Sequence, residues 1–365
     1  MSRVLVAMSG GVDSSVAAAL LVEQGFDVVG VTMKTFCYSE TPSHSKTCCG
    51  LDGISDAKQV AAELGISHYV FDVEDDFERD VIDNFVTQYA EGKTPNPCVR
   101  CNGHTKFRDL MSRGRSLGCD HIASGHYVQI EHSDSQSRIL RGKDTKKDQS
   151  YFLWALPQNL LKSLLFPIGN LTKEQVRNHA HDYGFINADK AESQEICFVP
   201  TGNYRDLLQK RLGALHPALQ PGHLVRSSGK IVGKHNGYAG FTIGQRKGLG
   251  GGTPEPMFVL NINPTTKDVT VGTRAELFDD TVIVSGLNWT GEPINDGVEA
   301  LVQLRYRAPA ILATVSYDRG KDRIFLTLKE PQAAVTPGQS AVLFGQDNQC
   351  LIGGGTIVGA HSSKH

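Results

Sequence analysis

Apolar residues gather in short runs up to about residue 125, and amphipathic stretches separate these runs. The runs predict strands, and the stretches predict helices, one of them capped by Ser55 and ended by Gly65. The predicted strands cover residues 4–7, 28–33, 68–71 and 121–124, and the predicted helices cover residues 14–24, 55–65, 75–90 and 102–117. This alternation is typical of a parallel, doubly wound α/β sheet. Ligands of such sheets bind beyond the carboxyl ends of the strands.

The pattern changes in the second half of the chain. Thr172-x-x-Gln175 is a capping box that predicts a helix to about Tyr183. An extended segment is predicted at 193–200, a short helix at 203–212, and a small, mostly β region at 215–275, which is rich in Gly, Pro and β-branched residues. Apolar and polar residues then alternate with the period of strands, which predicts a small barrel or sandwich. These runs lie at 298–307, 311–317, 324–329, 340–344 and 351–358.

Composition narrows the class of protein. The 365 residues suffice for two or three domains, and 40% apolar with 21% charged residues is ordinary for a soluble globular chain. The net charge of −2 means that any nucleic acid must be bound through local patches. No stretch resembles a membrane span or a signal peptide, so we expect a cytoplasmic protein without membrane contact. The eight cysteines then favour reduced thiols, thiol chemistry or metal binding over a disulfide scaffold.

The turn after the first predicted strand consists of Ser9, Gly10, Gly11, Val12, Asp13, Ser14 and Ser15. Glycines allow a tight bend and a close approach to a ligand, and the helix that follows offers unpaired N–H groups and the positive end of its dipole. Strand, turn and helix together predict a phosphate site. No lysine follows the glycines, so this is not a Walker loop. It resembles the loop of the PP-loop ATP pyrophosphatases; the alternative is an ordinary βα turn.

Two cysteine segments carry the second chemical signal. In Thr94-Pro95-Asn96-Pro97-Cys98-Val99-Arg100-Cys101-Asn102, two prolines stiffen the chain before a predicted helix. Cys101 is expected at or near the N-terminus of that helix, where the dipole favours the thiolate. Cys98-x-x-Cys101 alone leaves redox chemistry, metal binding and a structural role open. Cys197 ends a polar motif, and a buried small hydrophobic residue is its alternative.

Two polar regions give only weak indications of function. The long segment from Cys37 to Gly53 is typical of a lid or binding loop. Its thiols, at Cys37, Cys48 and Cys49, are interpreted as chemically bland, and Cys119 and Cys350 are assigned no role. Residues 131–150 predict a solvated turn.

Several motifs, taken in order, resemble the family of tRNA-specific 2-thiouridylases. They are SGGVDSS at 9–15, TPNPCVRCN at 94–102, SGH at 124–126, KDQSYFL at 147–153, SQEICFVP at 193–200, GFTIGQRKGLG at 240–250 and RYRAPA at 305–310. The resemblance covers essentially the whole chain and implies a PP-loop domain at 1–200, a small central domain at 201–278 and a C-terminal β-barrel at 279–365. It also implies the reaction. ATP, with Mg²⁺ expected beside it, adenylates the C2 oxygen of the wobble uridine of tRNA, and sulfur then replaces that oxygen.

Site residues follow from the same resemblance. Those implied for ATP are Ala7, Met8, Ser9, Gly10, Gly11, Val12, Asp13, Ser14, Met33 and Gly125. Those implied beside the target base are Asn96, Pro97 and Cys98. Those implied for tRNA are His126, Lys147, Asp148, Gln149, Arg305, Tyr306 and Gln339. Cys101 is implied as the nucleophile, and Cys197 as the carrier of a persulfide that can form a transient disulfide with Cys101.

The partners implied are tRNAs for Lys, Glu and Gln, and a cysteine desulfurase or a sulfur-relay protein as the donor. Arg305 falls on the polar face of a predicted strand, where it would contact phosphate. A solvated sheet face is the alternative interpretation for Arg305 and Arg307.

One position departs from the family pattern. Many members have aspartate where this chain has Cys98, so an acid/base role for that side chain is in doubt. Cys98, Cys101 and Cys197 together offer three soft ligands, and a [4Fe-4S] cluster with one open iron is therefore an alternative to the persulfide route.

Two other classes of protein are weighed. An amidotransferase-type PP-loop synthetase is disfavoured by the paired Cys101 and Cys197 and by the predicted C-terminal barrel. A non-catalytic tRNA-binding or iron–sulfur carrier protein is disfavoured by the intact loop around Asp13.

Overall fold

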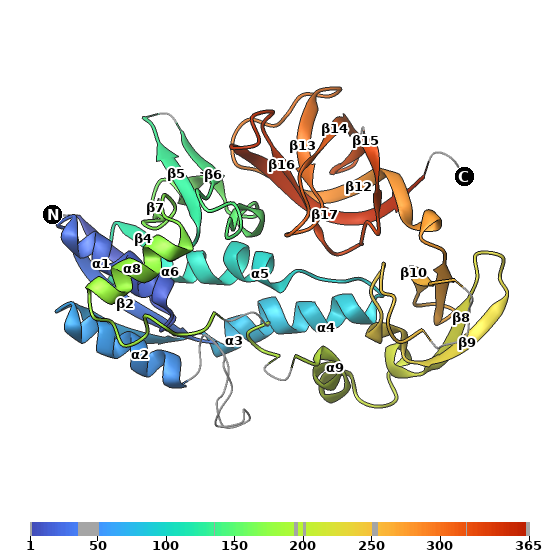
Figure 1. The fold of residues 1–365 in the computed structure, drawn as a ribbon, viewed down its shortest axis with the longest axis horizontal. Helices are drawn as coiled ribbons and strands as arrows, with labels where there is room; N and C mark the ends of the chain where they lie inside the picture. The colour runs from blue at the N-terminus through green and yellow to red at the C-terminus, as the bar shows by residue number, and fades with distance from the viewer. Residues whose placement is uncertain are drawn as a thin grey trace.

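The computed structural model describes residues 2–35, 51–134, 136–192, 196–199, 202–249, 255–318 and 320–362. Within these ranges the strands form a five-stranded sheet, a four-stranded sheet, a two-stranded hairpin and a closed six-stranded barrel. The large sheet, the small sheet and the barrel follow one another along the chain (Figure 1). The predicted α/β class is thus confirmed, and the C-terminal β region is a barrel rather than a sandwich.

The first sheet is parallel and has the order β3-β2-β1-β4-β7. Its strands are β1 (Arg3–Ala7), β2 (Asp27–Lys34), β3 (Ser67–Asp72), β4 (His121–Ser124) and β7 (Leu164–Leu165). Successive side chains of β1 point to opposite faces. Leu5 therefore packs into one hydrophobic cluster, while Val4 and Val6 pack into another. Because both faces are apolar, helices cover the sheet on both sides.

Helices α1 (Val12–Glu23), α2 (Leu51–Glu63) and α8 (Lys173–Asp182) share one of these clusters. Helix α6 (Phe107–Ser116) packs in the other. The capping box at Thr172 and Gln175 is present, as predicted. The prediction that Ser55 caps a helix is wrong, because α2 already begins at Leu51, with Asp52 in the first turn, where an acidic side chain favours a helix start.

Two long helical stretches run from the parallel sheet toward the small sheet (Figure 1). Each contains a π-helical segment, a feature often found at functional sites. The first consists of α3 (Glu74–Phe77), π-helical Glu78–Ile82 and α4 (Asp83–Ala90). The second consists of α5 (Pro97–Arg100), π-helical Cys101–Lys106 and α6.

The small sheet has the order β10-β11-β8-β9. Its strands are β8 (Pro221–Val225), β9 (Ile231–Asn236), β10 (Phe258–Asn263) and β11 (Asp268–Gly272). Its core also contains Phe77 and Phe85 of the first long helical stretch, together with Phe198. The short helix predicted at 203–212 is α9 (Tyr204–Leu212). The extended segment predicted at 193–200 is wrong where it is described, because the Val199 N–H donates to the Ile196 carbonyl at 2.8 Å and closes a turn.

The barrel closes in the order β12-β15-β14-β13-β16-β17 around an apolar interior. Its strands are β12 (Phe278–Trp289), β13 (Glu299–Gln303), β14 (Ile311–Tyr317), β15 (Arg323–Ala333), β16 (Ser340–Phe344) and β17 (Leu351–His361). The strand predicted at 298–307 is too long. The Gln303 side-chain amide donates to the carbonyls of Arg305 and Tyr306 at 3.1 and 2.6 Å, and thereby folds the chain into a turn after β13.

The region predicted as a solvated turn at 131–150 is partly structured. It contains most of the antiparallel hairpin of β5 (Val128–His132) and β6 (Ser137–Arg141), in which Ile139 is fully buried. An isolated bridge pairs Leu140 with Cys350 and ties the hairpin to the barrel. A short helix, α7 (Gln158–Leu161), follows.

Most of the predicted lid at 37–53, including Cys37, Cys48 and Cys49, lies outside the described residues. The domain boundaries at 200/201 and 278/279 stay predictions. No helix in the part of the chain that the structure describes is long and apolar enough to cross a membrane.

Candidate active site

The glycine loop joins the end of β1 to α1. Gly11 caps α1 in an extended conformation, and no side chain donates or accepts a capping hydrogen bond there. The first N–H groups of the helix are therefore left for an anion, which fits a nucleotide phosphate. Gly10 has φ +71°, and a Cβ at this position would lie 2.1 Å from the Gly53 carbonyl oxygen. Only glycine fits both constraints.

Side chains of the loop brace it from within. Ser14 Oγ accepts from the Ser9 N–H at 3.2 Å and donates to the Gly11 carbonyl at 3.0 Å. Met8 is buried, and its carbonyl accepts from Thr32 Oγ1 at 2.7 Å. The Met8 N–H donates to the Val31 carbonyl at 2.8 Å, so both polar backbone groups of Met8 already have partners within the protein.

The other residues predicted for ATP lie at neighbouring strand ends. Ala7 ends β1, and Met33 is nearly buried close to the end of β2. Gly125 directly follows β4, where a Cβ would lie 2.6 Å from the carbonyl carbon of Asp13. The β4 turn therefore packs against the backbone of α1, and the predicted positions share one edge of the sheet.

Asp13 lies within a set of polar side chains that the sequence pattern did not reveal. The Tyr127 hydroxyl donates to Asp13 Oδ1 at 2.6 Å, and Lys173 Nζ lies 2.7 Å from the same oxygen. Burial, followed by the charge of Asp13, raises the pKa of Tyr127. Lys173 comes from α8, distant in sequence from the loop, so no local motif could have indicated it.

The back of the loop is held by two further side chains from the same distant region. Lys190 Nζ donates to the Gly10 carbonyl at 3.1 Å and pairs with Asp56 at 2.5 Å. The Asn187 side-chain amide donates to the Gly10 carbonyl at 3.2 Å and to Ser15 Oγ at 2.9 Å. These bonds fix the position of the Gly10 carbonyl.

An ion-pair chain links the loop to the predicted tRNA segment. Glu192 pairs with Lys173 at 3.3 Å and with Lys147 at 2.5 Å. Burial alone would raise the pKa of Glu192, but the hydrogen bond from Lys147 and the charge of Lys173 hold it below its ordinary value. Lys147 is thus connected to Asp13 through two intervening side chains.

In the segment that contains the predicted nucleophile, residues 94–102, the helix begins earlier than predicted. Asn96 caps α5, accepting from the Val99 N–H at 3.4 Å, and Pro97 is the first helical residue. The helix therefore begins before Cys98, not at residue 102. Cys101 directly follows the first turn, so it lies near the N-terminus of the helix, as predicted, although not at its first position. An asparagine followed by proline is an N-cap signature that the sequence already contained.

Cys101 and Cys197 pack against the same hydrophobic cluster as Phe85 and Phe198. Both are partly buried, whereas Cys98 in the first turn is exposed. Among the residues that the structure describes, no group of three or more His, Cys, Asp or Glu is arranged to hold a metal ion. The described residues therefore give no support for a [4Fe-4S] cluster on Cys98, Cys101 and Cys197.

The residues predicted for tRNA fall into two groups. Lys147 and Gln149 belong to the part of the chain that contains the parallel sheet, the parallel-sheet unit. The Gln149 side-chain oxygen accepts from the Tyr127 N–H at 2.9 Å. His126 is enclosed by the rings of Phe107 and Phe166, and burial lowers its pKa well below the ordinary value. His126 is therefore neutral at physiological pH.

The second group belongs to the barrel. Arg305 is not on a strand face: it lies in the turn after β13 and donates to the Ala334 carbonyl and to Thr336 Oγ1. Burial lowers the pKa of its guanidinium group. Tyr306 packs against Phe152 with ring centroids 4.3 Å apart. Burial is the largest cause of the raised pKa of Tyr306, and Cys98 is among the charges that add to it, so the two residues lie near each other.

Gln339 connects the barrel to the cysteine segment, residues 94–102. Its side-chain amide donates to the carbonyls of Thr94 and Pro95 at 2.8 and 3.3 Å. A cavity of about 240 Å³ opens here, where the parallel-sheet unit, the small-sheet unit and the barrel meet. It is lined by Thr94, Thr242, Ile243, Arg305, Thr336 and Gln339.

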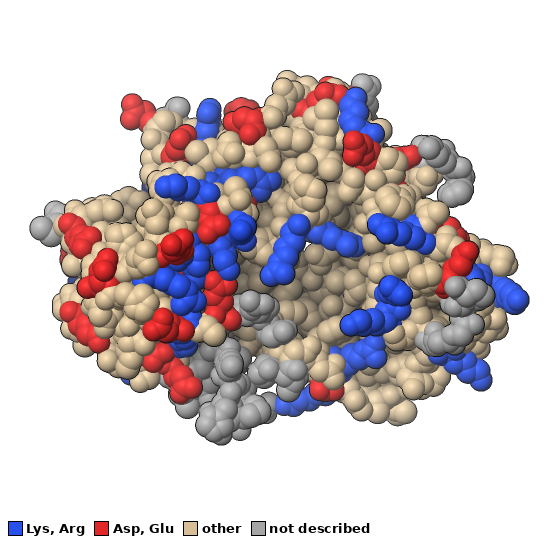
Figure 2. Space-filling view, viewed as in Figure 1, with Lys and Arg blue, Asp and Glu red and all other residues tan. Residues whose placement is uncertain are grey.

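On the face shown in Figure 2, Lys and Arg side chains border a hollow between the parallel-sheet unit, the barrel and the small sheet. Acidic side chains gather mainly toward the outer edges of the parallel-sheet unit and the barrel. Although the net charge of the chain is −2, this hollow presents the local basic surface that RNA binding requires.

A glycine loop at the edge of a parallel sheet, followed by a small β unit and a closed barrel, defines a nucleotide-binding α/β enzyme of the PP-loop type. Three family models match: the tRNA methyl transferase HUP domain over residues 2–201, the tRNA methyl transferase PRC-barrel domain over 206–273, and the Aminomethyltransferase beta-barrel domain over 279–357. A protein of Carboxydothermus hydrogenoformans named tRNA-specific 2-thiouridylase MnmA is 46% identical over 97% of both chains. One of the same name from Geotalea uraniireducens is 44% identical over 99% of this chain and 96% of its own. The chain belongs to the tRNA-specific 2-thiouridylase MnmA family and is an enzyme.

Membership confirms the resemblance found in the sequence and implies the use of ATP and Mg²⁺. Among solved structures, a 4-thiouridine synthetase in complex with RNA and ATP aligns with 59% of this chain and 51% of its own, at 12% identity and a TM-score of 0.36.

Proposed function

We propose that this chain uses ATP to activate the C2 oxygen of the wobble uridine in tRNA and then replaces that oxygen with sulfur. The observation that carries the proposal is family membership over nearly the full length of the chain. The uncapped start of α1 and the basic hollow agree with a nucleotide and an RNA as substrates.

The first step is adenylation. The uridine C2 oxygen attacks the α-phosphorus of ATP, an O–P bond forms, and pyrophosphate leaves. The oxygen, a poor leaving group in the base, then departs later as AMP. The N–H groups at the start of α1 would hold the phosphates. Gly125 allows the β4 turn to pack closely against the backbone of Asp13 in α1. A base displaced from the anticodon stack gives the enzyme access to C2.

The second step transfers sulfur from a persulfide on Cys197. In one route the terminal sulfur attacks C2, AMP leaves, and the Cys101 thiolate then attacks the Cys197 sulfur, which breaks the S–S bond to the product. In the other route Cys101 attacks first and releases hydrosulfide, which attacks C2. Either route leaves a Cys101–Cys197 disulfide, and two electrons from a cellular thiol reduce it. The shared hydrophobic cluster around both cysteines supports this pairing.

The persulfide itself is supplied from outside the chain, by a cysteine desulfurase or a sulfur-relay protein. The substrates we propose are tRNAs for Lys, Glu and Gln, which carry the wobble uridine. Lys147, Gln149, Arg305 and Tyr306 are proposed to hold the tRNA, and the nearly buried Asp148 to shape the segment between Lys147 and Gln149.

A reconstituted assay tests the proposal. The enzyme is incubated with ATP, a persulfide donor and unmodified tRNA, and 2-thiouridine is measured by mass spectrometry of nucleosides. Cys101→Ser and Cys197→Ser are expected to abolish the product. Cys119→Ser is the matched control, since Cys119 is buried and burial raises the pKa of its thiol. Full activity of either Cys101→Ser or Cys197→Ser would disprove the mechanism.

The cluster route remains a separate hypothesis, motivated by the thiol at Cys98 in the exposed first turn of α5. It requires the thiolates of Cys98, Cys101 and Cys197 to converge on one cluster. Iron and sulfide analysis of anaerobically purified, active enzyme distinguishes the routes. Stoichiometric iron that is lost in Cys98→Ser together with activity would favour the cluster over the persulfide.

A further inference from the structure

The glycine loop has no cation of its own. Residues 9–15 contain no lysine or arginine, although a lysine commonly reaches the phosphates in loops of related function. The fold instead brings two lysines to the loop, Lys173 at the first position of α8 and Lys190 in the segment that follows α8. The two lysines have different partners.

Lys173 lies on the side of the loop where α1 begins. Its ammonium group is 2.7 Å from Asp13 Oδ1 in the first turn of α1, and only 12% of its side chain is exposed. The backbone of Lys173 is anchored as well, because its N–H donates to Asp144 Oδ2 at 2.9 Å and the capping box of Thr172 fixes the helix start. A rigidly placed cation therefore stands beside the unfilled N–H groups of α1.

Lys190 is engaged elsewhere. It donates to the Gly10 carbonyl and pairs with Asp56 of α2, so it ties the loop to α2. Its ammonium group is thus shared between a carbonyl and a carboxylate outside α1. Of the two lysines, only Lys173 pairs with a side chain in the first turn of α1.

We propose that Lys173 is a substrate-positioning residue that binds the polyphosphate of ATP and the pyrophosphate product. The inference rests on the proposed function, because it concerns the same nucleotide site. Without nucleotide, Asp13 and Glu192 neutralise Lys173. An incoming polyphosphate, which carries more charge than a carboxylate, displaces the longer of these contacts, the 3.3 Å pair with Glu192.

This exchange predicts that removing Lys173 and removing the charge of Glu192 change pyrophosphate affinity differently. If Lys173 binds phosphate, removing the charge of Glu192 frees the lysine, and the affinity for pyrophosphate is retained or increases. If the Lys173–Glu192 pair were only structural, the loss of either partner would weaken nucleotide binding equally. Lys173→Met and Glu192→Gln are therefore predicted to have opposite effects.

Isothermal titration of the full-length protein with inorganic pyrophosphate, ATP and adenosine tests the proposal. Lys173→Met is expected to raise the Kd of pyrophosphate and ATP at least tenfold and to leave the Kd of adenosine, which has no phosphate, unchanged. Lys173→Arg should recover part of the loss, because it keeps the charge. Lys329→Met is the control: Lys329 pairs with Glu299 at 2.7 Å on the barrel, so this variant loses a lysine ion pair far along the chain from the loop.

The same variants separate this inference from the proposed function. Tight pyrophosphate binding by Lys173→Met, or an equal loss in Glu192→Gln, would overturn the role of Lys173 even if the wild type makes 2-thiouridine. A wild type that makes no 2-thiouridine while Lys173→Met loses pyrophosphate binding would overturn the proposed function and leave the role of Lys173 standing. In an active wild type, Lys173→Met should raise KM for ATP more than it lowers kcat, with the Kd of tRNA unchanged.

Discussion

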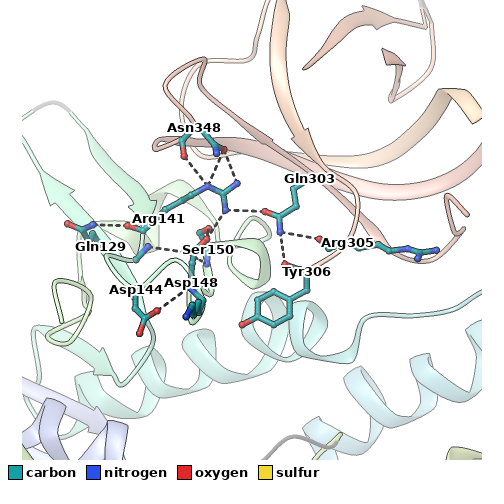
Figure 3. A network of polar contacts seen from close by, with 11 residues as sticks. Gln129, Arg141, Asp144, Asp148, Ser150, Gln303, Arg305, Tyr306 and Asn348 are labelled. Atoms are coloured by element: carbon teal, nitrogen blue, oxygen red, sulfur yellow. Dashed lines mark hydrogen bonds and ion pairs between the residues drawn. The ribbon is translucent and has the colours of Figure 1, made fainter. Parts of the chain in front are cut away.

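Arg141 and Asp148 form an ion pair of 2.7 Å with only 13% and 8% of their side chains exposed. The same guanidinium group donates to Gln303 Oε1 at 3.1 Å and to the Asn348 carbonyl at 3.0 Å (Figure 3). It also lies 3.6 Å from the ring centroid of Phe344. Arg141 belongs to the β5–β6 hairpin, whereas its last three partners belong to the barrel. One side chain therefore joins the parallel-sheet unit to the barrel.

This junction also organises both predicted tRNA segments. The Asp148 carboxylate accepts from the Gly142 and Ser150 N–H groups at 2.9 and 3.1 Å, which shapes the segment that carries Lys147. Gln303, held by Arg141, shapes the turn that carries Arg305 and Tyr306. Asp148 is nearly buried, so its carboxylate acts chiefly within the protein in this structure.

Replacing Arg141 with methionine should therefore destabilise the fold and weaken tRNA binding together. The buried carboxylate of Asp148 would lose its charge partner, a change that typically costs about 3–5 kcal/mol of unfolding free energy. Denaturant unfolding and a tRNA filter-binding assay measure the two effects. Lys329→Met, which removes an exposed ion pair, should cost no more than about 1 kcal/mol. Equal stability of the two variants would contradict the assigned role of Arg141.

Gly125→Ala should disturb the nucleotide site without touching a charged group. The added methyl group would lie 2.6 Å from the Asp13 carbonyl carbon, and a backbone atom cannot move aside cheaply. We expect the Kd of ATP to rise about tenfold and the unfolding free energy to fall by about 1–3 kcal/mol, the usual cost of overpacking. Gly359→Ala is the matched control, because its Cβ would meet only Ile283 Cδ1, at 3.7 Å. Unchanged ATP affinity in Gly125→Ala would show that the β4 turn tolerates displacement.

The sequence predicted features that depend on neighbouring residues and missed those that the tertiary fold creates. The order of β1, glycine loop and α1 is local, and so is the capping box at Thr172, so both were predictable. Lys173 meets Asp13 only because α8 packs beside α1, and a single sequence carries no signal of that contact.

Two errors at the site have physical causes. The alternation of apolar and polar residues continues past Gln303, but the bonds of its side-chain amide override the strand pattern and turn Arg305 inward. The helix that begins in the cysteine segment was predicted to start at residue 102, which is too late, because the apolar pattern begins only after the N-cap residue. Asn96 and Pro97 were the better guide to its start.

Asp279 is predicted to make the stability of the protein depend on pH. Burial raises its pKa from 3.8 to about 6, with His361 acting in the opposite direction. Ionised Asp279 therefore destabilises the folded state at full strength above pH 6, and this effect fades as the pH falls from 6 toward 3.8. Asp279→Asn should raise Tm by about 1–3 °C at pH 7.5 and by less at pH 4.5. The exposed Asp322→Asn serves as the control, and a gain that grows toward low pH would refute the assignment.

Gln339 is predicted to act by positioning the cysteine segment, and a direct contact with tRNA is the alternative expectation. Its amide donates to the Thr94 and Pro95 carbonyls, just before the turn that carries Cys98. Gln339→Glu would set a carboxylate against these carbonyl oxygens, so kcat for 2-thiouridine formation should fall at least tenfold while the Kd of tRNA changes less than threefold. The control is Gln332→Glu, because Gln332 also donates to two carbonyls on the barrel, but only to those of neighbouring residues. A large rise in the Kd of tRNA with kcat unchanged would instead assign Gln339 to the RNA interface.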